Sequence, residues 1–427
     1  MAAFWFITAP LPGHLDWGGM LKTALALRDA GHRVAWVSQP PIAPLLEATG
    51  IPFLAVEETG WLWPPPPLPD PRSLKPADAV FLRYRRALDT WLSEDLIPPA
   101  VDAILALAQQ HGKPDIIVAD PFLSAAAFAA EALDVPMIVA GWPAGQPLDE
   151  NNMLAVQSDL SHISKERIAH INQRLGLHAA NFSTGAAPSV QSPYLHVSYF
   201  SRAWHQADPN FLPQTRFVGG APSSPTTPVP EWLTAIPDST PLALITLGST
   251  FTGDLGFFSW AAQASVRLGL LPIVVLGRNP IASEEKAALK AALPPGTRLL
   301  TWLDYDHVFP RLKLIIHHGG MGTTHRALIQ GIPQVCVPHA ADQRGQARRV
   351  AQAKVGLNLT AHDVKNGQLL PAIRAVISDS RVFAAAQQWA SNLASLGGPA
   401  RAAELMIQVA EGILTPYPAE QRSLPQN

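Results

Sequence analysis

Short runs of consecutive apolar residues alternate with helical patterns along the first half of the chain. Helical patterns lie at residues 20–27 and at the alanine-rich Ser124–Leu133. The strand-like runs are Phe4–Ala9, Arg33–Ser38, Asp115–Ala119 and Pro136–Ala140. Continuous valine and isoleucine runs separated by helices are typical of a parallel sheet that helices cover on both faces. The first half therefore predicts a parallel α/β domain.

A second series with the same alternation begins at Leu242. Helical patterns such as Glu284–Ala292 and Thr323–Gln330 separate its strands. The strand-like runs are Leu242–Leu247, Pro272–Leu276, Arg298–Trp302, Lys313–His317, Gln334–Val337 and Val355–Leu359. Between the two series, Ala221–Pro230 has the proline-rich composition of a semi-rigid linker. The fold class is therefore α/β, with two doubly wound, Rossmann-like parallel-sheet domains.

The change of composition near residue 221 sets the expected domain limits. We expect an N-terminal domain over 1–220, a linker over 221–240 and a second domain over 241–400. A C-terminal helix and tail should occupy 401–427. Whether this segment crosses back to pack on the N-terminal domain stays open.

The overall composition narrows the class of protein. The chain has 427 residues and a mass of 45.8 kDa, which suits two domains of about 100–200 residues. Charged residues make up only 15% and the formal net charge is −2, which argues against binding nucleic acid through a basic face. The single cysteine, Cys336, excludes an internal disulfide framework and a cysteine-rich metal site. Its apolar neighbours predict a buried side chain.

The N-terminal segment Met1–Ile7 has neither the basic region nor the cleavage site of a signal peptide. The chain also lacks an uninterrupted apolar stretch of about 18 residues, so no transmembrane segment is expected. We expect a cytoplasmic protein, and the low charge leaves peripheral membrane contact open.

The glycine-rich segment His317–Thr324 follows a predicted strand and opens a predicted helix. Such a turn presents unpaired backbone N–H groups at the positive end of the helix dipole. Thr323 and Thr324 add hydroxyl donors, and His318 adds an imidazole donor, so the segment suits a diphosphate. It lacks the lysine of a Walker A loop. The alternative is an ordinary strand–helix turn with a threonine cap.

A carboxylate and a carboxamide, Asp342 and Gln343, follow the next predicted strand. Such a pair can bind vicinal hydroxyls through two hydrogen bonds. The alternative is an ordinary helix start.

These motifs together carry a resemblance to a known family. Their order along the chain is Trp302, His317–Thr324, Gly331–Pro333, Pro338 and Asp342–Gln343. This series resembles the donor-binding signature of the family-1 GT-B glycosyltransferases, the superfamily of UDP-glycosyltransferases and bacterial macrolide-type enzymes. The resemblance implies two domains facing a cleft and an NDP-sugar-dependent hexosyltransferase. It also implies that neither a cofactor nor a divalent metal is needed.

The resemblance assigns a nucleotide-sugar donor, UDP-glucose or a dTDP-sugar, to the second domain. His318 would contact the diphosphate, Trp302 would stack on the base, and Asp342 with Gln343 would hold sugar hydroxyls. The complete donor set is Gly248, Ser249, Thr250, Trp302, Tyr305, His318, Gly320, Gly322, Thr323, Thr324, Asp342 and Gln343.

Two departures from the family pattern bear on the nucleotide. Many members carry proline and glutamine two and three residues after the tryptophan, where this chain has Asp304 and Tyr305. Many also carry a ribose-binding glutamate where this chain has Arg326. A missing ribose carboxylate makes dTDP-sugars as suitable as UDP-sugars. The alternative for Arg326 is a solvated helix arginine.

The resemblance also implies a catalytic pair in the first domain. His14, in the loop after the first predicted strand, would be the general base, since an imidazole of pKa about 6.5 can accept a proton at pH 7. Asp120, at the end of another strand, would orient it, with Asp16 as the alternative carboxylate. Attack by an acceptor hydroxyl in a single displacement would invert the anomeric centre.

The acceptor site should lie in first-domain loops rich in aromatic residues and proline. The residues we assign to it are Trp17, Trp61, Trp63, Phe81, Tyr84 and Trp142. Because charges are few there, we expect a hydrophobic small-molecule or lipid-like acceptor. The alternative is that these rings pack in the core.

Two other functions stay open at this point. One is a non-catalytic nucleotide-sugar-binding auxiliary subunit, which the presence of both His14 and Asp120 disfavours. The other is a GT-B epimerase or lipid-precursor transferase, whose phosphate loops differ from this series. Of the remaining histidines, we expect His317 to pack at a strand end, His325 to lie on a helix surface and His339 to be a weaker candidate for touching the donor sugar.

Overall fold

The structure is a computed structural model that describes residues 1–15, 18–64, 66, 75–145, 155–183, 188–205, 211–222, 228–248, 255–277, 281–339 and 343–418. Four predicted site residues, Trp17, Ser249, Thr250 and Asp342, lie outside the described residues, as does the alternative carboxylate Asp16. For His14 the backbone is described and the side chain is not.

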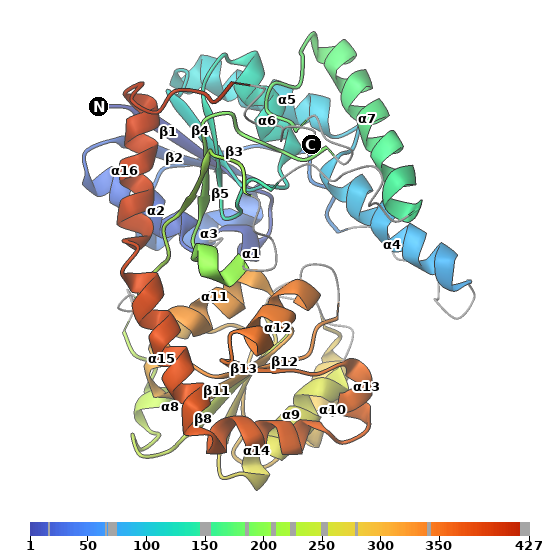
Figure 1. Cartoon of the computed structure of the whole chain (residues 1–427), viewed down its shortest axis with the longest axis vertical. Coiled ribbons are helices and arrows are strands. Elements are labelled where there is room, and N and C mark those ends of the chain that lie inside the picture. The colour runs from blue at the N-terminus through green and yellow to red at the C-terminus, as the bar shows by residue number, and fades with distance from the viewer. Residues whose placement is uncertain are drawn as a thin grey trace. The chain divides into compact units, whose positions relative to one another are not determined.

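The chain divides into two compact units. Unit 1 contains Met1–Tyr199, Ala207–Val218 and Pro399–Asn427, and unit 2 contains Phe200–Gln206 and Gly219–Gly398. Each unit holds one parallel sheet between helices (Figure 1), which confirms the predicted fold class.

The sheet of unit 1 has the strand order β3-β2-β1-β4-β5-β6-β7, and every pairing is parallel. Its strands are β1 (Ala3–Ile7), β2 (Arg33–Ser38), β3 (Phe53–Ala55), β4 (Ile116–Ala119), β5 (Met137–Ala140), β6 (Leu195–Ser198) and β7 (Thr215–Phe217). The chain leaves β1 toward β3 on one side and then continues from β4 on the other. The carboxyl ends of β1 and β4 therefore flank a topological switch point, where open α/β sheets bind ligands.

Helices cover this sheet because each buries one apolar stripe. In α5, for example, Ile97, Val101 and Ile104 recur at helical spacing and are almost fully buried. The helices of unit 1 are α1 (Pro12–Leu15), α2 (Met20–Asp29), α3 (Ala43–Leu46), α4 (Pro76–Trp91), α5 (Ile97–His111), α6 (Ser124–Ala132), α7 (Ala155–Leu175) and α16 (Gly398–Ala410).

The C-terminal segment belongs to unit 1. Pro399, at the start of α16, lies beside Gly19 at the start of α2, where an added Cβ would be 3.3 Å from its ring. Beyond α16, the Tyr417 backbone N–H donates to Pro193 O over 2.8 Å, and its hydroxyl accepts from Arg216 Nη2 over 2.9 Å.

The sheet of unit 2 has the order β10-β9-β8-β11-β12-β13. Its strands are β8 (Leu242–Thr246), β9 (Leu271–Val275), β10 (Arg298–Leu300), β11 (Leu312–His317), β12 (Gln334–Cys336) and β13 (Gly356–Asn358). The side chains of β8 alternate between two hydrophobic clusters, so both faces of the sheet are covered. The switch point of this sheet lies between β8 and β11.

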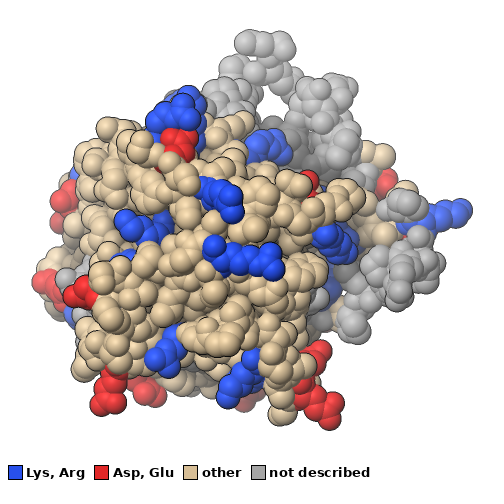
Figure 2. Space-filling model, turned by 90° about the horizontal axis from the view of Figure 1, so that it is seen from below, with Lys and Arg blue, Asp and Glu red and all other residues tan. Residues whose placement is uncertain are grey.

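The longer helices of unit 2 cover its sheet. They are α9 (Leu255–Arg267), α10 (Ser283–Ala292), α11 (Met321–Ile329), α12 (Gln343–Gln352), α14 (Leu369–Ser378) and α15 (Ser380–Ala394), with the short α8 (Glu231–Thr234), α13 (Ala361–Lys365), η5 (Arg202–His205), η6 (Tyr305–His307) and η7 (Phe309–Arg311). On the face shown in Figure 2, lysine and arginine side chains are scattered among uncharged residues, in keeping with the low charge content.

Part of the range expected as linker packs into unit 2. Leu233 on α8 and Ile236 are almost fully buried in the cluster below β8. The Arg311 guanidinium donates to the carbonyl oxygens of both residues, over 3.0 and 2.9 Å. α8 and Ile236 thus pack against this unit.

The expectation of a surface position for His325 is wrong. Its ring is 1% exposed and packs edge-to-face against Phe200 at 5.1 Å. Phe200 precedes η5, which belongs to unit 2 and is further held by a 2.8 Å hydrogen bond from Trp204 Nε1 to Gln346 Oε1. A distant part of the chain therefore covers the helix face that sequence reasoning left to solvent.

Candidate functional site

Three loops meet at one edge of the unit 2 sheet. His317 on β11 is in register with Thr246 on β8 and with Cys336 on β12. Because these strands are parallel and adjacent, the loops that follow them start side by side. They carry Gly248, His318 and His339, and the first two flank the switch point between β8 and β11.

The turn after β11 needs its glycines. Gly319 has a φ of +79° in the left-handed region, and an added Cβ would lie 2.9 Å from Gln343 O. Gly320 is the N-cap residue of α11, which begins at Met321 rather than at the predicted Thr323. Gly322 and Thr323 therefore lie among the first residues of the helix, whose backbone N–H groups have no acceptor within it. The N–H of the next residue, Thr324, donates to Gly320 O over 2.9 Å.

Two glycines enclose the His318 ring. A Cβ on Gly248, which has a φ of +79°, would lie 2.6 Å from His318 Cε1, and a Cβ on Gly320 would collide with Nε2. Burial, with smaller contributions from His317 and His339, lowers the pKa of His318 to about 3. The ring is therefore neutral at pH 7. Its Nδ1 has no hydrogen-bond partner among the described residues.

The two threonines of the turn have different surroundings. Thr324 is fully buried, and its hydroxyl has no hydrogen-bond partner within the described part of the chain. Thr323 is half-buried. Gly322 is open, because a Cβ there would meet no described atom within 4 Å. The structure thus brings Gly248 and His318 together beside the first turn of α11, with open space at Gly322.

Tyr305 supports the loop that carries Gly248. Its hydroxyl donates to Thr246 Oγ1 over 3.1 Å, and the same oxygen accepts the Gly248 backbone N–H over 3.1 Å. Burial raises the pKa of Tyr305. Trp302, in contrast, is 49% exposed after β10, so a broad aromatic surface stands near the carboxyl edge of the sheet.

Arg326, for which a solvated helix arginine was the alternative, is only partly exposed. Its guanidinium carbon lies 6.0 Å from the centre of the Tyr305 ring and its Nη1 lies 4.0 Å from Asp306 Oδ1. The side chain is 29% exposed. Because η6 places Tyr305 and Asp306 against this face of α11, the arginine rests on them.

Gln343, the first residue of α12, accepts the His339 backbone N–H on Oε1 over 2.9 Å. Its side chain therefore closes the loop after β12. His317 is buried at the end of β11, and Cys336 is fully buried, as predicted for both.

The switch point of unit 1 carries the other predicted pair. Ile7 on β1 is in register with Ala119 on β4, so the loops after these strands start side by side. The first leads into α1, which contains His14. The second begins with Asp120, which is fully buried and accepts the Phe122 backbone N–H on Oδ1 over 2.8 Å. The backbone thus brings these two sequence positions to one sheet edge.

The predicted acceptor aromatics divide into two groups. Trp61, Phe81 and Trp142 are half-buried, and Trp61 packs against the core of unit 1. Trp63 and Tyr84 are 42% and 46% exposed.

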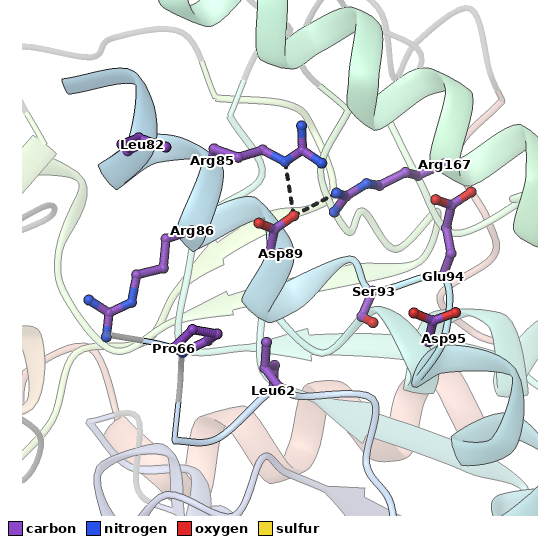
Figure 3. Close-up of a pocket in the computed structure, with 10 residues that line it drawn as sticks. All are labelled: Leu62, Pro66, Leu82, Arg85, Arg86, Asp89, Ser93, Glu94, Asp95 and Arg167. Atoms are coloured by element: carbon purple, nitrogen blue, oxygen red, sulfur yellow. Dashed lines mark hydrogen bonds and ion pairs between the residues drawn. The ribbon is translucent and has the colours of Figure 1, made fainter. Parts of the chain in front are cut away.

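Sequence reasoning missed a charged pocket in unit 1, which the charge spacing on α4 could have indicated. Arg85 Nε and Arg167 Nη2 both donate to Asp89 Oδ1, over 3.0 and 2.5 Å, at the meeting of α4 and α7 (Figure 3). The pocket has a volume of about 440 Å³ and is lined by Leu62, Pro66, Leu82, Arg85, Arg86, Asp89, Ser93, Glu94, Asp95 and Arg167. This lining differs from the low-charge surface expected near Trp61 and Trp63.

No group of three or more histidine, cysteine, aspartate or glutamate side chains in the part of the chain that the structure describes could hold a metal ion. No helix in the same part is long and apolar enough to cross a membrane.

Comparisons with known proteins agree with this architecture. Residues 279–409 match the family of the erythromycin biosynthesis protein CIII-like C-terminal domain. The chain is 25% identical to the NDP-glycosyltransferase YjiC of Bacillus subtilis (strain 168), over 93% of this chain and 94% of that protein. It is 26% identical to the demethyllactenocin mycarosyltransferase of Streptomyces fradiae, over 97% and 87% of the two chains.

A solved structure shares the fold over the same extent. The spinosyn rhamnosyltransferase SpnG has a TM-score of 0.71 and 21% identity, with 95% of this chain and 100% of that chain covered. It has also been solved with spinosyn aglycone and with thymidine diphosphate. Two doubly wound units, a C-terminal family match and nearly full-length similarity to glycosyltransferases together support a family-1 GT-B glycosyltransferase.

Proposed function

We propose that the protein is an inverting hexosyltransferase. It moves a sugar from a nucleoside-diphosphate sugar to a hydroxyl group of a hydrophobic small-molecule or lipid-like acceptor. The observation that carries this proposal is the grouping of Gly248, His318 and the first turn of α11, with open space at Gly322, at the switch point of unit 2.

The donor site would bind a diphosphate through neutral donors. The first N–H groups of α11 offer hydrogen bonds and the positive end of the helix dipole. A neutral His318 adds one ring N–H, and the Thr323 hydroxyl adds another donor. Trp302 offers its exposed ring to the nucleobase. Gln343 and Asp342 would hold the sugar hydroxyls.

The nucleoside is uridine or thymidine. SpnG binds thymidine diphosphate, and this chain has Arg326 where a ribose-binding carboxylate would stand. An arginine cannot accept hydrogen bonds from ribose hydroxyls. This residue therefore removes one reason for preferring a ribonucleotide, and a dTDP-sugar is as suitable as a UDP-sugar.

The reaction is a single displacement with His14 as general base. Its imidazole takes the proton of the acceptor hydroxyl while the oxygen forms a bond to the anomeric carbon. The bond from that carbon to the diphosphate breaks on the opposite face, and the electron pair leaves with the nucleoside diphosphate. The first turn of α11 and His318 stabilise the departing charge. Asp120 orients the imidazole and stabilises its charged form.

The acceptor would lie against unit 1. The exposed rings of Trp63 and Tyr84 and the half-buried Trp61, Phe81 and Trp142 supply an aromatic surface. Aromatic and apolar linings favour hydrophobic ligands.

Donor binding is tested by thermal shift with UDP, dTDP and GDP. We expect stabilisation by UDP or dTDP, of about 2.7 kcal/mol at a hundred times Kd. Gly322→Leu is the matched variant, because its side chain would enter the open space without meeting a described atom within 4 Å of Cβ. It should keep the Tm of the free protein and lose the nucleotide shift. No shift with any nucleotide in the wild type would refute the donor site.

The catalytic pair is tested by steady-state kinetics. His14→Ala should lower kcat at least about a hundredfold, because a general base contributes typically 10²–10⁴-fold. The Kd for the nucleotide should stay within about twofold, since His14 belongs to unit 1. Asp120→Asn should lower kcat less than His14→Ala. An unchanged kcat for His14→Ala would show that another group takes the proton.

A further inference from the structure

His317 is the last residue of β11 and immediately precedes His318. Its side chain is fully buried, so it cannot contact a bound donor directly. Both ring nitrogens are nevertheless engaged. Nδ1 lies 3.1 Å from the Gly319 backbone nitrogen, and Nε2 lies 2.9 Å from Gln334 Oε1 on β12.

These contacts determine the tautomer. A backbone N–H can only donate, so Nδ1 must carry a lone pair, and the proton of the neutral ring lies on Nε2. That N–H donates to Gln334 Oε1, with Cys336 Sγ 3.3 Å away as a weaker neighbour. Burial lowers the pKa of His317 to about 4. The neutral tautomer that this hydrogen-bond pattern requires is therefore the form present at pH 7.

The bond to Gly319 acts on the peptide group that joins His318 to Gly319. Fixing that peptide sets the direction of the chain just after His318 and holds Gly319 at its positive φ. The space around the turn is tight on the other side, because the Gly319 Cα faces Gln343 O closely enough to exclude a side chain. A rotation of the peptide would therefore move the His318 ring out of its place between Gly248 and Gly320.

We propose that His317, held by Gln334, is a positioning residue for the nucleoside-diphosphate site. It works through the Gly319 N–H to keep His318 and the first turn of α11 in the geometry that receives the diphosphate. The role rests on the proposed donor function, and it adds two buried residues that do not touch the substrate.

Two substitutions of His317 separate this role from general stability. In His317→Asn the side-chain carbonyl oxygen branches from Cγ, as Nδ1 does, and can still accept the Gly319 N–H. In His317→Gln the amide reaches the place of Nε2 and can still donate to Gln334, but it leaves the Gly319 N–H without its acceptor. Because both variants lose the buried imidazole ring, their Tm values should decrease by similar amounts.

We expect His317→Gln to weaken binding of the preferred nucleoside diphosphate at least tenfold and to raise the donor KM with it. His317→Asn should stay within about threefold of the wild type. Calorimetric titration with UDP and dTDP measures the Kd, and steady-state kinetics separates KM from kcat. If both variants bind like the wild type, the role of His317 is overturned while the donor site stands. If the wild type binds neither nucleotide, the donor function itself fails.

Gln334→Glu provides a second measurement. A carboxylate facing Nε2 would favour the imidazolium form, which carries a proton on Nδ1 as well, so that two N–H groups would oppose each other at Gly319. The other titratable groups near the ring are Cys336 on β12, whose pKa burial raises, and His318, at a ring distance of 6.2 Å. We measure the nucleotide affinity of both proteins at pH 8 and at pH 6. The loss of affinity on this change of pH should be at least tenfold larger for Gln334→Glu than for the wild type. Parallel pH profiles would contradict the proposal.

Discussion

The two units are wound in the same way but differ in what stands at their switch points. In unit 1 the ends of β1 and β4 lead to α1, with His14 in its sequence, and to the buried carboxylate Asp120. In unit 2 the ends of β8 and β11 lead to glycines and to the neutral His318. The shared topology thus fixes where a ligand can bind, and the residues after the strands decide which chemistry is available there.

The difference is one of charge. A carboxyl group at the same sheet edge as a histidine position suits the movement of a proton, as proposed for His14 and Asp120, because a carboxylate can stabilise an imidazolium. Glycines and a histidine of lowered pKa suit the binding of an anion through backbone and neutral N–H groups. Three consequences would test how far this contrast holds.

The largest expected effect concerns acid stability. Burial lowers the pKa of His205, His317 and His318 in unit 2 to between about 3 and 4, and that of His196 in unit 1 to about 4. Below about pH 6.5 these histidines become protonated in the unfolded chain but stay neutral in the folded protein. The free energy of unfolding therefore decreases as the pH falls. Between pH 7 and pH 5 each should cost about 2 kcal/mol, or about 6 kcal/mol for the three in unit 2.

Hydrogen exchange followed by mass spectrometry measures this loss for each unit separately. Peptides of the unit 2 sheet should lose protection at a higher pH than peptides of the unit 1 sheet. His205→Gln should reduce the difference between the pH values at which the two sheets lose protection. Earlier loss of protection in unit 1 would show that buried neutral histidines do not govern the acid response.

The second effect concerns the glycines around His318. Gly248→Ala would place a Cβ 2.6 Å from the His318 ring, whereas Gly269→Ala would meet no described atom within 4 Å. Both residues have nearly the same positive φ, 79° and 77°, so both substitutions should cost about 1–2 kcal/mol of stability. Only Gly248→Ala should also weaken nucleotide binding, by roughly ten- to a hundredfold, or about 1.4–2.7 kcal/mol. Calorimetric titration of both variants measures the difference, and equal affinities would remove His318 from the site.

The smallest effect concerns the support beneath Gly248. Tyr305→Phe removes the hydrogen bond to Thr246 and should lower the free energy of unfolding by about 1 kcal/mol. Nucleotide affinity should change less than threefold, because the phenylalanine ring still supports the Arg326 side chain in the place of the Tyr305 ring. Urea denaturation measures the stability, and the exposed Tyr84→Phe serves as the control. A larger loss of affinity than of stability would make the Tyr305 hydroxyl part of the binding site itself.

The sequence predicted those features that depend on neighbouring residues. The apolar runs predicted two parallel sheets because buried parallel strands carry apolar side chains on both faces. The glycine-rich segment after β11 predicted a helix start with unpaired N–H groups, and the structure places one at Met321.

Features that depend on distant parts of the chain could not be predicted. Nothing near His325 shows that Phe200 covers it, and nothing near Arg326 shows that Tyr305 and Asp306 lie beneath it. The ion pair between Asp89 and Arg167 joins residues 78 positions apart. Local periodicity indicates which face of a helix or strand is apolar. It does not indicate which distant segment packs on the polar face.

The path of the chain imposes an order on synthesis. Unit 1 is encoded first, yet its last segment starts at Pro399, after the 180 residues of Gly219–Gly398 in unit 2 (398 − 219 + 1). At about 5–20 residues per second, a ribosome needs roughly 10–40 seconds to cross that interval. During this time the nascent N-terminal unit lacks α16 and the contacts of Pro399 and Tyr417. The unit that emerges first is therefore the last to be complete.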